Sequence, residues 1–134
     1  MPRSDSHAVG IRILLLDDSA MLRTLLAQLL EDLDFVESVV QVDDVASALY
    51  AMRAAPFDFA ILDLNIPGFD TVKNGIDLAR VVKTNHPGTQ VALLSALADT
   101  YDSDAGIAAG ADRFYDKGEF DGLLDWITES ARTA

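Results

Sequence analysis

The chain has 134 residues, half of them hydrophobic, which is the size and composition of one compact domain with its own core. Its formal net charge of −12, from 22 acidic and 10 basic residues, argues against direct nucleic-acid binding, because that requires a basic patch to neutralise phosphates. There are no cysteines, so disulfides, thiolate metal sites and cysteine nucleophiles are excluded. This composition fits a cytoplasmic protein.

The N-terminal region shows no targeting segment. Residues 1–9 are polar and are predicted to form a flexible tail, whereas residues 10–134 are predicted to form a single domain. The first apolar run, Ile11–Leu16, is too short for a signal peptide or a membrane span. We therefore expect no membrane association.

The first elements alternate between strand and helix. Ile11–Leu16 is apolar except for Arg12, which predicts a strand buried on both faces. Ser19 is a suitable cap for a following helix, in which leucines recur at three- and four-residue spacing from Leu22 to Leu33. Phe35–Val42 is rich in valine and predicts a second strand.

The alternation continues to the end of the chain. A helix with an apolar face from Val45 to Met52 is expected to end at Pro56. The remaining elements are a strand over Phe57–Leu62, a helix over Ile76–Lys83, a strand over Gln90–Leu94, a weakly patterned helix over Asp99–Ala109 with Gly110 as C-cap, a strand over Asp112–Tyr115, and a helix from Phe120 to near Ala131. Five strands alternating with five helices predict a parallel sheet that is covered on both faces.

Residues capable of chemistry gather where these strands end. They are Asp17 and Asp18 after the first strand, Asp63 after the third, Ser95 after the fourth, and Asp116 and Lys117 after the fifth. Because ligands of an open parallel sheet bind beyond the carboxyl ends of its strands, these side chains are expected to meet at one edge.

The three carboxylates of Asp17, Asp18 and Asp63, held close together, would repel one another and require a cation at neutral pH. Their hard oxygen atoms, with no histidine or cysteine nearby, suit Mg²⁺. A carboxylate can also act as a nucleophile and form an acyl phosphate, whose charged oxygens Lys117 and the Ser95 hydroxyl could bind. Each residue has a simpler explanation as a helix cap, a turn residue or a solvated charge, but the coincidence at four strand ends favours a functional site.

Four segments resemble the receiver domains of response regulators in two-component signalling. They are LLLDDSAMLRTLL from Leu14 to Leu26, AILDLNIPG from Ala60 to Gly68, VALLSAL from Val91 to Leu97, and AGADRFYDKGEF from Ala109 to Phe120. The likeness covers residues 11–131, and within this family the chain is similar to the single-domain chemotaxis regulator. It implies an α/β fold of the flavodoxin-like (βα)5 type, a doubly wound five-stranded parallel sheet with strand order 2-1-3-4-5.

The resemblance also implies a role for each matching residue. Asp63 would accept a phosphoryl group from a histidine kinase, a histidine phosphotransfer protein or a small phosphodonor. Mg²⁺ would be held by Asp18 and Asp63, helped by Asp17 and by the backbone carbonyl of Asn65. The phosphoryl group would be bound by Ser95 and Lys117, and Phe114 would be the aromatic switch residue.

This sequence departs from the family pattern in three places. Gly118 replaces the proline that usually follows the lysine, about four extra residues lengthen the loop over residues 68–74, and Phe114 replaces the commoner tyrosine. Lys73, in the longer loop, could approach the site, although a solvated side chain is the simpler expectation. The resemblance does not predict the backbone geometry after the fifth strand.

The resemblance implies a signalling domain that catalyses only its own phosphorylation and dephosphorylation and then switches a protein-binding face. A downstream protein partner is expected, and a homodimer or a place within a longer regulator is left open. One alternative is a pseudo-receiver that binds or dimerises without phosphorylation. A magnesium-dependent phosphatase of the haloacid-dehalogenase type is disfavoured, because its nucleophile lies on the first strand in a D-x-D pattern, whereas Asp17 and Asp18 are adjacent.

Overall fold

The computed structural model describes residues 10–96 and 100–133, so the predicted tail over residues 1–9 and the predicted helix start at Asp99 lie outside the described residues. The elements, in chain order, are β1 (Ile11–Leu16), α1 (Ala20–Glu31), β2 (Val36–Val42), α2 (Val45–Ala54), β3 (Phe59–Asp63), α3 (Gly75–Asn85), β4 (Gln90–Ser95), α4 (Thr100–Ala108), β5 (Arg113–Asp116) and α5 (Phe120–Thr133).

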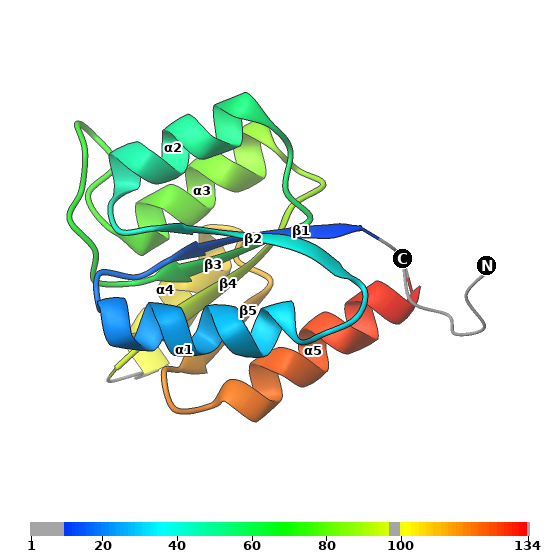
Figure 1. Ribbon diagram of the computed structural model, residues 1–134. Helices are drawn as coiled ribbons and strands as arrows, with labels where there is room; N and C mark the ends of the chain where they lie inside the picture. The colour runs from blue at the N-terminus through cyan, green and yellow to red at the C-terminus, as the bar shows by residue number, and fades with distance from the viewer. Residues whose placement is uncertain (1–9, 97–99, 134) are drawn as a thin grey trace.

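The strands form one parallel sheet in the order β2-β1-β3-β4-β5, as the resemblance implied. Figure 1 shows α2 and α3 on one face of this sheet and α1 and α5 on the other. Helix α4 lies on the α2/α3 side, where Gly106 packs against Leu93 and Phe114. The predicted doubly wound α/β architecture is therefore confirmed.

Apolar side chains fill both spaces between the sheet and its helices. Because successive strand residues point to opposite faces, Leu14 and Leu62 pack under α2 and α3, whereas Ile13 and Ile61 pack against α1 and α5. All four are completely buried, and each contributes about 1.5–3 kcal/mol relative to an exposed side chain. The central strands are thereby fixed in register, which fixes the residues at their carboxyl ends.

Two strand boundaries differ from the prediction because buried aromatic residues precede the paired segments. Phe35 is buried and its carbonyl accepts the Ile11 N–H at 3.0 Å, but strand β2 begins only at Val36. Phe57 is also buried outside a strand, and Asp58 after it uses its carboxylate to accept the Arg12 N–H at 2.9 Å. Strand β3 then extends to include Asp63.

Helix and strand ends also shift slightly. Helix α3 begins at Gly75 because the side chain of Asn74 caps it, accepting the Asp77 N–H at 3.0 Å. Helix α5 continues to Thr133, past the expected end at Ala131, and β5 runs one residue later than expected. None of the helices within residues 10–96 and 100–133 has the length and apolar character needed to cross a membrane.

The extra residues of the loop over 68–74 fold into a small hairpin. Phe69 and Val72 exchange backbone hydrogen bonds of 2.9 and 3.0 Å around a two-residue turn in which Asp70 has a φ of 57°. Val72 is buried in the core, whereas Phe69 is 55% exposed. The insertion is therefore anchored to the α2/α3 side of the sheet by its second arm.

Gly75 is predicted to be intolerant of a side chain. A Cβ at this position would collide with the backbone oxygen of Asp63 and the Cα of Leu64, because α3 starts in direct contact with the end of β3. Gly75→Ala should lower the free energy of unfolding by about 1–3 kcal/mol in urea denaturation. Gly118→Ala is the matched control, since nothing lies within 4 Å of a Cβ there and its φ is outside the left-handed region. That variant should be neutral or slightly more stable.

Candidate functional site

Three carboxylates meet at the carboxyl edge of the sheet, as the sequence predicted. Asp17 and Asp18 follow β1, and Asp63 is the last residue of β3. One carboxylate oxygen from each lies within 4.8 Å of the others. Asp17 and Asp63 are only 1% and 2% exposed, whereas Asp18 is exposed, so the cluster is open to solvent on one side only.

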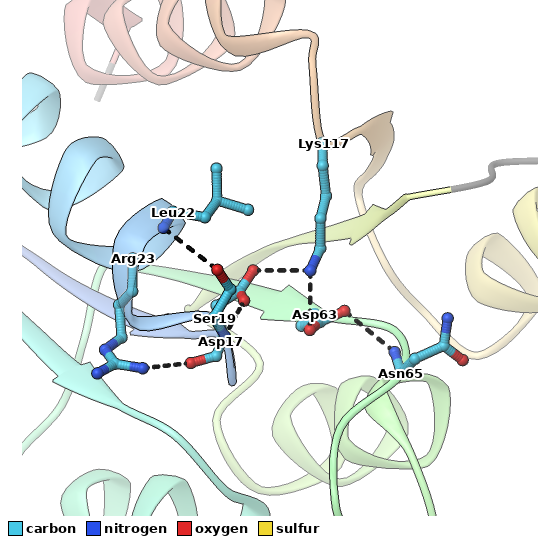
Figure 2. Close-up of polar contacts among 7 residues, drawn as sticks. All are labelled: Asp17, Ser19, Leu22, Arg23, Asp63, Asn65 and Lys117. Carbon is cyan, nitrogen blue, oxygen red and sulfur yellow. Dashed lines mark hydrogen bonds and ion pairs between the residues drawn. The ribbon is translucent and has the colours of Figure 1, made fainter.

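Lys117 bridges the two buried carboxylates. Its Nζ lies 3.0 Å from Asp63 Oδ2 and 3.1 Å from Asp17 Oδ2, as Figure 2 shows. The lysine is positioned by its backbone, because its N–H donates to the Ser95 carbonyl at 2.9 Å directly after β5. The end of β5 therefore delivers an ammonium group to the ends of β1 and β3.

Asp17 combines a local structural role with its place in the cluster. Its Oδ1 accepts the Ser19 N–H at 2.8 Å, and the Ser19 hydroxyl caps α1 by accepting the Leu22 N–H at 3.3 Å. Arg23 donates from its guanidinium to the Asp17 carbonyl at 2.6 Å (Figure 2). Sequence reasoning gave Arg23 no role. Its position four residues after the cap, within the first turn of a helix next to the acidic pair, was the available signal.

Asp63 is held by the loop that follows it. Its Oδ1 accepts the Asn65 N–H at 3.1 Å, and the Leu64 N–H donates to the Leu94 carbonyl at 2.8 Å. The Gly75 N–H returns to the Leu64 carbonyl at 2.9 Å, which closes the loop with the hairpin inside it. Lys73 in that loop is exposed and its backbone N–H donates to Asp77 Oδ2 at 2.9 Å, which agrees with the expectation of a solvated side chain.

The charges of the cluster perturb one another. Burial raises the pKa of Asp63 above its ordinary value, and the nearby Asp17 charge raises it further, against the lowering effect of the hydrogen bond from Lys117. Burial alone would lower the pKa of Lys117, but its contacts with Asp63 and Asp17 outweigh burial and raise it. Lys117 therefore holds its proton and its positive charge. The negative charge of Asp63 is only partly compensated by its surroundings.

The cluster has the chemistry of a divalent-cation site. One ammonium faces three carboxylates, so an excess of negative charge remains. Asp17 Oδ2 is buried and forms an ion pair with Lys117, but within the described part of the chain it accepts no hydrogen bond. A hard cation such as Mg²⁺ would use such an oxygen and would offset the repulsion, so the residues present fit the ion.

Ser95 and Phe114 share one face of the sheet beside the cluster. Ser95 ends β4 and is 1% exposed. Phe114 in β5 pairs in register with Leu93, and its half-buried ring packs against the core under α2 and α3. Because residues two apart in a strand point the same way, Ser95 and Phe114 lie on the same side of neighbouring strands.

The segment after Lys117 is regular at the position where Gly118 departs from the family pattern. All peptide bonds among the described residues are trans. The Glu119 N–H donates to the Asp116 carbonyl at 2.9 Å, and the Glu119 carboxylate accepts the Asp116 N–H at 2.9 Å. These two bonds close a turn between β5 and α5, and Lys117 is one of the two residues between the bonded pair.

Comparison with known proteins settles the family. Residues 13–127 match the sequence model of the response regulator receiver domain. The chain belongs to this family. This receiver is 37% identical over 103 residues to the DNA-binding response regulator MtrA of Mycolicibacterium paratuberculosis, in an alignment that covers 77% of this chain and 43% of that protein. The match therefore spans less than half the length of that relative.

Two further proteins that the chain matches are closer to it in length. The receiver is 33% identical over 89 residues to the chemotaxis protein CheY of Pseudomonas aeruginosa, covering 66% of this chain and 68% of that one. Its fold is similar to the crystal structure of a CheY-like response regulator receiver domain protein from Methanospirillum hungatei JF-1, with a TM-score of 0.80, 24% identity and coverage of 91% and 94% of the two chains.

Removing the buried charge of Asp63 is expected to stabilise the metal-free protein at neutral pH. Because burial raises the pKa of Asp63 above 3.8, the folded state holds this proton more tightly than the unfolded chain does. The penalty is absent below pH 3.8 and grows as the pH rises through the folded pKa. Asp63→Asn should therefore raise the free energy of unfolding at pH 7 in EDTA by on the order of 1 kcal/mol.

Urea denaturation of both proteins across the acid range would measure this difference. The gain should shrink toward zero as the pH falls through the folded pKa of Asp63. Asp125→Asn, which changes an exposed carboxylate on α5, should show no comparable gain at pH 7. If Asp63→Asn raised the free energy of unfolding by the same amount at every pH, the buried charge of Asp63 would not be the cause of the gain.

Proposed function

We propose that this receiver is a phosphoacceptor in a two-component phosphorelay, with Asp63 as the residue that takes the phosphoryl group. The observation that carries this proposal is the position of Asp63: a buried carboxylate at the end of a central strand, 3.0 Å from an ammonium group and beside two further carboxylates. An acid in this setting is positioned for attack on phosphorus at the open side of the cluster.

The donor would be a phosphohistidine of a histidine kinase or a phosphotransfer protein. A carboxylate oxygen of Asp63 forms the new bond to phosphorus while the bond from phosphorus to the histidine nitrogen breaks. The electron pair of the broken bond stays on the imidazole, and Asp63 becomes an acyl phosphate. In the same step Lys117 exchanges a carboxylate partner for a phosphoryl oxygen, and this keeps its positive charge matched.

The metal would be held by Asp17, Asp18 and Asp63, together with the backbone carbonyl of Asn65. When bound, Mg²⁺ supplies positive charge that lowers repulsion between these carboxylates and the incoming phosphoryl oxygens. Asp17 would use its buried Oδ2, which accepts no hydrogen bond from the described residues. Exposed Asp18 would lie on the side from which the donor approaches.

The response to phosphorylation would pass through Ser95 and Phe114. The Ser95 hydroxyl would bind the phosphoryl group, and the ring of Phe114 on the neighbouring strand would change its packing in response. The readout would be a protein contact in the cytoplasm, and the chain would turn over no metabolite. DNA binding is a property stated for MtrA, whereas the net charge of −12 argues against direct nucleic-acid binding by this chain.

Phosphorylation can be tested on the purified protein with Mg²⁺ and acetyl phosphate, followed by intact mass. We expect a gain of one phosphoryl group that requires both Mg²⁺ and Asp63. Asp63→Asn should abolish the adduct, and Asp125→Asn, which alters an exposed carboxylate outside the cluster, should leave it unchanged. Lys117→Met should lower the yield by about tenfold or more, because one charge-assisted contact to the phosphoryl group is lost.

Binding of beryllofluoride should be followed by NMR in parallel, because rapid hydrolysis would hide the covalent adduct. Chemical shifts of Ser95 and Phe114 should then move together with those of the acidic cluster. The absence of both the adduct and analogue binding would sink the proposal and leave phosphorylation-independent binding as the function.

A further inference from the structure

An open apolar groove lies between helix α2 and the edge strand β2, away from the acidic cluster. Its volume is about 590 Å³, within the range of pockets that hold small molecules. Val40 and Val42 form its floor, and Tyr50 on α2 stands at its rim with 76% of its surface exposed. None of the acidic residues of the cluster lines it.

The groove exists because of the residues that α2 presents above β2. Ala46, Ala51 and Ala54 line its helical wall, and their short side chains leave space over the two valines. Ala46 and Ala54 are exposed, so longer side chains there would fill the space without entering the buried face of the helix. Val45, Ala48 and Met52 make that face.

One cation is fixed at one end of the groove. The Arg12 guanidinium stacks on the ring of Phe57, 4.6 Å from its centroid, and its Nη1 donates to the Pro56 carbonyl at 2.6 Å. Within residues 10–96 and 100–133, Arg12 forms no ion pair with a carboxylate. The nearby Asp58 carboxylate instead accepts the backbone N–H of Arg12 at 2.9 Å.

A guanidinium held in this way has a fixed plane and several donors to spare. Such a fork matches both oxygens of a carboxylate, and the pairing is strengthened where apolar walls reduce the solvent around it. Arg12 would therefore bind the charged end of a ligand, and the two valines would bind its apolar end.

We propose that the α2/β2 groove is a binding site for a small amphipathic carboxylate. The carboxylate group of the ligand pairs with Arg12, and its apolar body lies over Val40 and Val42 beside Tyr50. This site lies on the opposite side of β1 from β3, which carries Asp63. The inference does not depend on phosphorylation, so the two proposals fail or succeed independently.

The test uses 4-phenylbutyrate as probe and 4-phenylbutyramide as its uncharged match, titrated into the ¹⁵N-labelled full chain. A ligand of this size should bind with a dissociation constant on the order of 1 mM. We expect saturable shifts in α2, β2 and Arg12 with the acid, and at least about tenfold weaker binding of the amide, because it lacks the charge that Arg12 recognises.

Three variants separate charge from shape. Arg12→Gln should weaken binding of the acid by about tenfold. Arg53→Gln is the matched control and should leave binding unchanged, since it removes an exposed arginine of α2 that does not line this groove. Ala54→Leu should weaken the acid and the amide alike by filling space at an exposed helical position.

The outcomes decide the proposal. Equal affinity for acid and amide, or an unchanged affinity in Arg12→Gln, would overturn the carboxylate assignment. Absence of shifts at about 10 mM probe would overturn the site itself, given the affinity expected for such a ligand. Because loss of the Phe57 stacking could unfold Arg12→Gln, the acid-against-amide comparison on the unaltered chain tests the charge requirement without any substitution.

Discussion

The ion pairs that join Lys117 to Asp63 and Asp17 are the interaction on which the rest of this site depends. Two of the three carboxylates are almost fully buried, and carboxylates in that position repel each other strongly. A single ammonium at 3.0 and 3.1 Å holds them together, yet one charge does not neutralise three. The remaining negative charge is what makes the site receptive to a divalent cation.

The fold contributes by fixing the backbone from which these side chains project. Leucine and isoleucine side chains bury both faces of β1 and β3, so Asp17 and Asp63 emerge from rigid strand ends. The start of α3 lies against the end of β3 so closely that Gly75 has no room for a side chain. The well-packed strands and helices thereby hold the carboxylates together despite their mutual repulsion, which is the usual arrangement at functional sites.

Two of the three departures from the family pattern, the longer loop and Gly118, are accommodated without disturbing the site. The longer loop over residues 68–74 forms a hairpin anchored by buried Val72, so it displays Phe69 to solvent without entering the acidic cluster. Gly118 continues a trans chain into a turn closed by Glu119, and it has open space around it. Both features leave Lys117 and Asp63 in contact, which is consistent with a functional phosphoacceptor site.

The sequence by itself determined the alternation of strands and helices and the residues that stand at the strand ends, because hydrophobic periodicity and turn chemistry are local properties. It also contains the motifs that resemble receiver domains, and the strand order 2-1-3-4-5 was inferred from that resemblance. It missed the cap at Asn74 and began two strands too early, at Phe35 and Phe57, since these apolar residues are buried although they lie outside the strands.

Only the tertiary structure decided how the chemical groups meet. Lys117 and Asp63 are separated by 54 positions, and their hydrogen bond exists because the pairing of β4 with β5 places one beside the other. The groove at Arg12 likewise arises from packing between distant segments, because residues of β1, β2 and α2 line it together. No local pattern specifies such contacts, because they depend on which surfaces the whole chain brings together.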